Sequence, residues 1–171
     1  MSYSTSIFQV SLLVAVFLCT IVFGFILLFA IVVIMPGIGL FLDNGSFLRV
    51  FQVIDGIIQR KQPVFVSIWV GSVIALLVAA GLGWGELDGS QPAWIVTATV
   101  AYMVAQVTTF TFNVPLNNRL PELEIEFLDA TRKATERAAF EQKWNVWNWF
   151  WTVTIGFVAL AISRRALVVY H

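Results

Sequence analysis

Two short polar clusters stand at the ends of strongly apolar stretches of this sequence. The first is Asn113-Val-Pro-Leu-Asn-Asn-Arg119, and the second is Trp144-Asn-Val-Trp-Asn148. A primary amide has four hydrogen-bonding positions to satisfy, and an indole supplies a flat apolar wall. Amides that converge between aromatic walls are what a pocket for a small molecule requires. We therefore predict a ligand site where the two clusters meet.

Polar side chains also follow one face of the apolar stretch before the first cluster. They are Thr99, Tyr102, Gln106, Thr109 and Asn113, at helical spacings of three and four. That face should look into a bundle, because an unpaired polar group is costly in lipid. Hydrogen bonds between helices explain Thr99 and Thr109 well, whereas Gln106 and Asn113 fit ligand contacts equally well.

The second cluster opens a helix on which indoles and polar groups share one face. Its members are Trp144, Trp147, Asn148, Trp151 and Thr152. A belt of tryptophans at the membrane interface is the alternative explanation, but it does not account for an asparagine among the indoles. We expect Asn148 to donate a hydrogen bond into the pocket.

Part of the first cluster has a simpler structural explanation. Asn117 or Asn118 could end a helix, and the Arg119 side chain could extend to lipid headgroups. Pro115 is expected to break the helix among these residues. Three amides beside that break still form the richest hydrogen-bonding site in the sequence.

Four apolar stretches are expected to position these clusters in a membrane. Crossing a bilayer takes about 20 mostly apolar residues, and residues 7–35, 64–84 and 93–112 qualify. Residues 147–162 form a shorter fourth candidate, which the amphipathic segment before it is expected to extend. Pro36 is expected to end the first stretch, which lacks a basic leader and is too long for a signal peptide. We predict an all-α four-helix transmembrane bundle that forms a single integral membrane domain over residues 1–171.

The composition supports a membrane protein and excludes several functions. Hydrophobic residues make up 59% of the chain, against roughly 45–50% in soluble domains. The net charge of zero gives no reason to expect nucleic acid. With only Cys19 and His171 as soft or imidazole ligands, no disulfide, haem or zinc site is expected. We predict no metal site, although the composition does not exclude a metal ion bound by carboxylates.

Basic residues are concentrated in the connections that follow the first and third spans. Those two connections carry eight of the ten Lys and Arg residues: Arg49, Arg60, Lys61, Arg119, Arg132, Lys133, Arg137 and Lys143. Positive charge favours the cytoplasmic side. We therefore predict cytoplasmic connections and external termini, in a bacterial inner membrane.

Both connections are expected to contain amphipathic interfacial helices. Ser46 is predicted to cap the first, whose polar stripe holds Gln52, Asp55 and Gln59. A surface helix with a wet face explains this stripe without any site. The second connection runs from acidic to basic residues, which suits a helix dipole and a solvated face.

Several motifs, in their order and spacing, resemble one family of membrane proteins. They are Met35-Pro36-Gly37 after a span containing Gly24, Phe51-Gln52-Val53-Ile54-Asp55 followed by Gln62-Pro63-Val64-Phe65, Asn113-Val114-Pro115-Leu116-Asn117-Asn118, and Phe140 with Trp144-x-x-Trp147-Asn148. They span nearly the whole chain, which is similar to the anthrone oxygenase-like (noranthrone monooxygenase-like) proteins. The Asn-Val-Pro-Leu-Asn and Trp-x-x-Trp-Asn motifs are the most specific.

The resemblance implies an oxygenase that converts an anthrone to an anthraquinone with molecular oxygen and no cofactor. The protein must then remove a proton and stabilise an oxyanion. Asp55 is the expected base, because burial at the membrane surface would raise its pKa. The expected catalytic residues are Asp55, Asn113, Asn117, Asn148 and Arg119, and the expected substrate-binding residues are Gln52, Gln106, Asn118, Trp144, Trp147 and Trp151.

Two departures from the family pattern leave a second interpretation open. Asp55 stands where the family usually has Asn, and Trp151 where the motif Trp-Asn-x-x-Arg-Thr has its arginine. The alternative is a non-catalytic subunit that binds a lipid or a quinone. A channel is less favoured, because the spans lack charges and repeated halves. The expected partners are membrane lipid and a hydrophobic aromatic molecule, and a homo-oligomer is compatible with the sequence.

Overall fold

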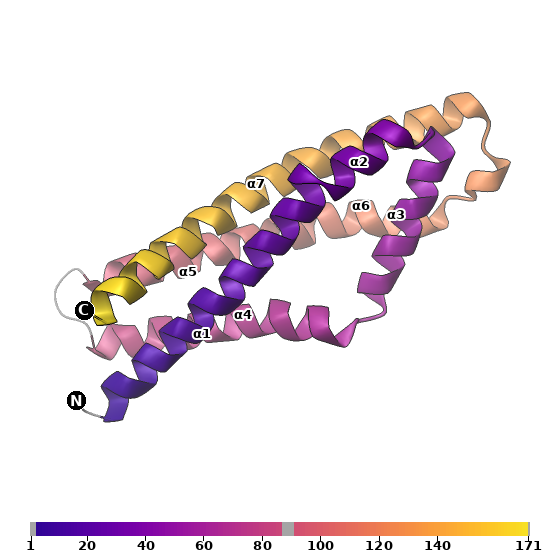
Figure 1. The fold of residues 1–171 in the computed structure, drawn as a ribbon. Helices are drawn as coiled ribbons and strands as arrows, with labels where there is room; N and C mark the ends of the chain where they lie inside the picture. Colours follow the sequence, from indigo (N-terminus) through magenta and orange to yellow (C-terminus); the bar gives the residue numbers. More distant parts are fainter. Residues whose placement is uncertain (1–2, 87–90, 171) are drawn as a thin grey trace.

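The computed structural model describes residues 3–86 and 91–170, which are helical except for short connections (Figure 1). His171 lies outside these ranges. In chain order the elements are α1 (Tyr3–Ile26), π-helical η1 (Leu27–Val32), α2 (Ile34–Phe41), α3 (Asn44–Gln59), α4 (Pro63–Glu86), α5 (Gln91–Thr108), π-helical η2 (Thr109–Asn113), α6 (Val114–Arg119), the short turns η3 (Leu120–Glu122) and η4 (Ile125–Phe127), and α7 (Ala130–Tyr170).

Four helical runs of the described chain are long and apolar enough to cross a membrane, which confirms the predicted all-α four-span class. They cover Ile7–Phe41, Pro63–Gly85, Pro92–Glu122 and Ala130–Leu167. α1 packs against α4 and α7, and α5 packs against α7 and α4. The helices α3 and α6 lie at the end of the bundle opposite the two termini (Figure 1). The two long connections therefore meet at one end, as four spans require.

Pro36 does not end the first helix, contrary to the prediction. The helix is interrupted earlier, at Val33 (φ −123°), after the π-helical turn η1. α2 then continues to Phe41 with Pro36 in its first turn. Proline is tolerated there because the first-turn N–H groups have no partner within the helix.

Pro115 is likewise incorporated rather than breaking the helix. The π-helical turn η2 precedes it, and Pro115 is the second residue of α6. A π-helical turn adds a residue to the ladder and is often found at functional sites. The Asn113 side chain, at the end of η2, is buried in the bundle.

The two connections also differ in detail from the expected helices. Asp43, not Ser46, caps α3: its side chain accepts hydrogen bonds from the backbone N–H groups of Gly45 (2.9 Å) and Ser46 (3.0 Å). In the second connection the acidic residues lie in η3, η4 and the segments beside them, before any long helix. α7 starts at Ala130 and extends far beyond the predicted span of residues 147–162.

Candidate functional site

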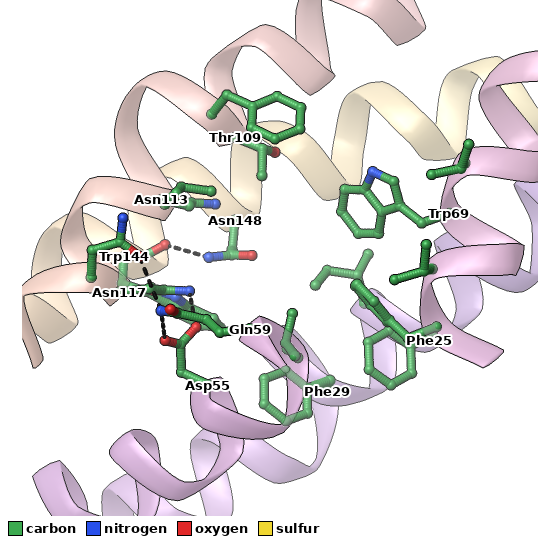
Figure 2. A pocket seen from close by; sticks show the side chains of 18 residues that line it. Phe25, Phe29, Asp55, Gln59, Trp69, Thr109, Asn113, Asn117, Trp144 and Asn148 are labelled. Carbon is green, nitrogen blue, oxygen red and sulfur yellow. Dashed lines mark hydrogen bonds between the residues drawn. The ribbon is translucent and has the colours of Figure 1, made fainter. Parts of the chain in front are cut away.

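A cavity of about 270 Å³ lies inside the bundle at the end closed by α3 (Figure 2). Its polar lining residues are Asp55, Gln59, Thr109, Asn113, Asn117, Asn118 and Asn148. Its aromatic lining residues are Phe25, Phe29, Phe65, Trp69, Phe110 and Trp144. The structure therefore brings both sequence clusters together, and it adds α3, α1 and α4 to the walls.

Asp55 is the carboxylate of this cavity. The residue is 3% exposed. Asn117 Nδ2 donates a hydrogen bond to Asp55 Oδ1 (2.9 Å), and Gln59 Nε2 donates to Asp55 Oδ2. Burial raises the pKa of Asp55, and the hydrogen bonds from Gln59 and Asn117 oppose that rise without cancelling it. A buried carboxyl with a raised pKa is suited to taking up a proton.

Asn148 presents its oxygen to the cavity. Its Nδ2 donates to the Trp144 carbonyl oxygen, one turn earlier in α7 (2.8 Å). The side-chain oxygen points toward the centre of the cavity (Figure 2). This differs from the predicted donor role, because the cavity-facing atom is an acceptor. The backbone carbonyl of an adjacent turn competed for the amide hydrogen.

Asn113 supplies the donor in its place. Its Oδ1 is buried without a hydrogen-bond partner, and the residue lines the cavity beside Asn148. The amide nitrogen of Asn113 points toward Asn148 and the cavity (Figure 2). One donor and one acceptor thus stand next to each other, within a wall that also holds Asp55.

The opposite part of the cavity is aromatic. Phe25 and Phe29 stack at 5.8 Å between ring centroids, and the Phe29 ring meets the Trp144 ring edge-on at 6.3 Å. Trp69 lines the cavity and stacks on Trp151 at 5.2 Å. Trp151, predicted to bind substrate, does not line the cavity and instead supports Trp69 from behind.

Two predicted site residues hold the scaffold together instead of lining the cavity. Arg119 Nη2 forms an ion pair with Glu136 Oε2 on α7 (2.7 Å). Gln52 Nε2 donates to the carbonyl oxygens of Leu120 (2.7 Å) and Leu123 (3.0 Å), which fixes η3 against α3. The partners of both residues are distant in sequence, so no local pattern indicated them.

Two further predicted binding residues also lie away from the cavity. Trp147 stacks on Phe112 with a centroid distance of 3.6 Å and an interplanar angle of 3°. Gln106 is buried, and neither its amide nitrogen nor its amide oxygen has a hydrogen-bond partner. These two residues belong to the contact between the α5–η2 run and α7.

The cavity is also lined by Gln59, Trp69, Phe25 and Phe29, which were not predicted from the sequence to belong to the site. Gln59 lies one helical turn after Asp55, and that spacing was a usable signal. The three aromatic residues lie inside apolar spans, where nothing distinguishes a cavity wall from ordinary core. Within residues 3–86 and 91–170, no group of three or more His, Cys, Asp or Glu side chains could hold a metal ion.

The fold and the site define a four-span helical membrane protein with a small cavity lined by amides, a carboxylate and aromatic rings. The family model for anthrone oxygenase matches residues 56–161. The chain belongs to the anthrone oxygenase family. The matched segment includes the asparagines of the cavity and begins one residue after Asp55. Comparisons with curated proteins and with solved structures found no match.

Proposed function

We propose that this protein is a membrane-embedded oxygenase that acts on a flat phenolic molecule of the anthrone type without a cofactor. The observation that carries the proposal is the division of the cavity into two walls. One wall holds Asp55 and the amides, and the other holds aromatic rings. The volume of about 270 Å³ is near the lower end of small-molecule pockets, which favours a compact ligand.

The reaction needs only a base and polar groups that stabilise charge. Asp55 removes a proton from the methylene carbon of the anthrone, which leaves an enolate. The enolate passes one electron to dioxygen, and the resulting radicals join in a carbon–oxygen bond. The peroxide formed takes back the proton from Asp55.

A second proton transfer completes the oxidation. Asp55 removes the remaining proton of the same carbon, the oxygen–oxygen bond breaks, and a ketone forms. The departing hydroxide takes the proton and leaves as water. The methylene carbon supplies all the electrons that dioxygen accepts, so no other reductant enters the balance.

The amides have different roles in the proposed reaction, because some act as hydrogen-bond donors and others as acceptors. Asn113, as a donor, suits the enolate oxygen. Asn148, as an acceptor, suits a phenolic O–H of the same ring system. Asn117 and Gln59 are positioning residues that hold the Asp55 carboxylate. Arg119 is committed to Glu136 and has no part in this proposal.

The direct test is oxygen consumption by the purified protein in detergent with emodin-type anthrones and related hydroquinones. Wild type is expected to consume one dioxygen for each anthraquinone formed. Asn113→Leu should slow turnover by about 10²-fold, in line with the loss of one oxyanion donor. Trp147→Phe, outside the cavity, is the matched control. No oxygen uptake with any of these substrates would contradict the proposal.

A binding protein for a lipid or a quinone is the second candidate. None of the described residues that line the cavity is basic, so an anion there would have only uncharged donors. Both oxygens of Asp55 already accept hydrogen bonds. Wild type that retains a quinone through purification, and consumes no oxygen with any anthrone, would favour this function.

A further inference from the structure

Most of the exposed apolar residues of the cavity lining lie on one side of it. Val66 and Val70 of α4 are 36% and 47% exposed, and Phe110 of η2 is 65% exposed. Phe25 of α1, which is 47% exposed, is the exception on another side of the cavity. Asp55, Asn113 and Asn148, in contrast, are buried. The cavity therefore has a wall of low cover between α4 and η2.

The helix packing explains why this side is open. α4 packs against α1 and α5, but in the described chain it makes at most slight contact with η2 and α6. Towards the α3 end, α4 diverges from α6 (Figure 1). We call the resulting opening the α4–η2 slit, and its rim consists of Val66, Val70, Phe110, Gln59 and Asn118.

The rim of the α4–η2 slit changes character along its length. Val66, Val70 and Phe110 belong to the membrane-spanning runs. Asn118 lies further towards the α3 end of the same run as Phe110, and there Gln59 Nε2, which lies outside the runs, donates to Asn118 Oδ1 (3.0 Å). An apolar rim at bilayer depth with a polar pair at its outer end matches a flat aromatic ring that carries polar groups on one edge.

The side of the cavity between α1 and α4 is covered by aromatic rings. Phe25 and Phe65 meet edge-on at 6.1 Å, and Phe65 and Trp69 lie 5.2 Å apart. A separate hollow of about 230 Å³ lies beyond them and is lined partly by Val64 and Ile68. The rings of Phe25, Phe65 and Trp69 line both spaces.

We propose that the ligand enters the cavity sideways from the bilayer through the α4–η2 slit, as a membrane-dissolved flat aromatic molecule with a polar edge. The ring passes between Val66, Val70 and Phe110, while its polar edge stays beside Gln59 and Asn118. The proposal rests on the proposed function for the kind of ligand, but the route can be tested without turnover.

The test measures binding rates of a flat phenolic quencher, emodin, in vesicles that contain the purified protein. Quenching of tryptophan fluorescence reports binding, because Trp69 and Trp144 line the cavity. At partition equilibrium the amount of a quencher per lipid is proportional to its aqueous concentration, so emodin is compared with a more polar hydroxyanthraquinone at equal aqueous concentrations, after the partition coefficient of each has been measured. Entry from the bilayer predicts that the association rate follows the amount of quencher per lipid, whereas entry from water predicts that it follows the aqueous concentration.

Paired variants locate the route on the protein. Val66→Phe with Val70→Phe narrows the slit and should slow association and dissociation by the same factor, about tenfold, with Kd unchanged. Ile74→Phe with Val78→Phe is the matched control, because both residues are exposed on α4, they have the same spacing, and neither lines the cavity or the second hollow. Phe110→Ala should speed both rates.

Each other outcome has a definite meaning. An association rate that follows the aqueous concentration, or equal effects of the two variant pairs, would overturn the sideways route alone. A slit variant that weakens Kd through dissociation only would make Val66 and Val70 a wall of the site and not an entrance. Failure of wild type to bind emodin would count against the proposed function and the route together.

Discussion

At the scale of single residues, the buried Asp55 carboxylate lowers the stability of the fold when it is ionised, and the same raised pKa suits it to act as a base. Burial raises its pKa more than the hydrogen bonds from Gln59 and Asn117 lower it. The folded protein therefore holds the Asp55 proton more tightly than the unfolded chain does. This group contributes stability at pH values below the ordinary carboxyl pKa, and the contribution is lost as pH rises through the raised pKa.

Asp55→Asn should separate the two effects. The amide has a similar shape and no charge to bury, so we expect the variant to unfold at a higher temperature than wild type near pH 7 and at a similar temperature near pH 4. Oxygen uptake should fall, because an amide accepts no proton. Thermal unfolding in detergent across this range checks the prediction, and a variant that is less stable at every pH would contradict it.

The pH dependence of turnover should follow the same group. The base form of Asp55 is ionised, so the rate is expected to rise with pH through a pKa above the ordinary value of 3.8. Initial rates of oxygen uptake over a pH series measure this rise. In Gln59→Leu, which removes one hydrogen bond to the carboxylate, the rise should move to higher pH. A shift to lower pH would argue against Asp55 as the base.

Gln106 is a second residue whose surroundings do not match its chemistry. Its amide is buried with both polar atoms unpaired. Gln106→Met should therefore stabilise the protein by about 1–2 kcal/mol, since an unpaired buried amide is costly. Thermal unfolding measures the change, with Thr97→Val on the exposed face of α5 as control. A loss of stability would show that the amide has a partner worth keeping.

At the scale of elements, Arg137 joins the α2–α3 corner to α7. Its guanidinium donates to the carbonyl oxygens of Gly39 (2.6 Å) and Leu42 (2.9 Å), and it lies 4.3 Å from the centroid of the Phe47 ring. These contacts hold the start of α3 in place. Because α3 carries Asp55, the geometry of the cavity depends on this corner.

Arg137→Met should destabilise the protein by about 2–4 kcal/mol, because it removes charge-assisted hydrogen bonds and a ring contact. Arg132→Met is the matched control. The Arg132 side chain is 67% exposed, 3.8 Å from Glu136, and its loss should cost less than about 1 kcal/mol. Thermal unfolding of both variants decides the matter. Equal effects would mean that the corner is held by apolar packing alone.

The positions of the helices were predicted better than the points at which they end or are interrupted. Hydropathy located all four spans, since about 20 apolar residues in succession have few alternative structures. Pro36 and Pro115 were wrong as helix ends, because π-helical turns and first-turn positions accommodate both. A π-helical turn depends on packing around it and has no sequence signature of its own.

At the scale of the whole molecule, the end of the bundle that holds the cavity is predicted to face the cytoplasm. Thr135→Cys on α7 should react with a membrane-impermeant maleimide only after cells are opened. Gly85→Cys, at the far end of α4, should react in intact cells. Both positions are exposed, and the native Cys19 is buried and should stay silent. The reverse pattern would contradict the orientation inferred from basic residues.

Six of the eleven residues assigned to the site from the sequence line the cavity, which has eighteen lining residues. Asp55, Asn113, Asn117, Asn118, Asn148 and Trp144 do line the cavity, because polar groups on apolar helices turn toward the bundle interior. Arg119 and Gln52 do not line the cavity, and their partners, which come from other parts of the chain, could not be read from the local sequence. The α4–η2 slit could not be predicted from the sequence, since it depends on how far α4 diverges from the η2–α6 run.

α7 is one unbroken helix from Ala130 to Tyr170, and it carries both Arg137 and Asn148. Eleven residues separate them, about 16 Å along a rod with no joint between. A ligand that immobilises Asn148 should therefore also reduce the motion of the α2–α3 corner, which is bound by Arg137. Binding of a ligand in the cavity should then be detectable at the α2–α3 corner, as slower amide hydrogen exchange around Gly39 and Leu42.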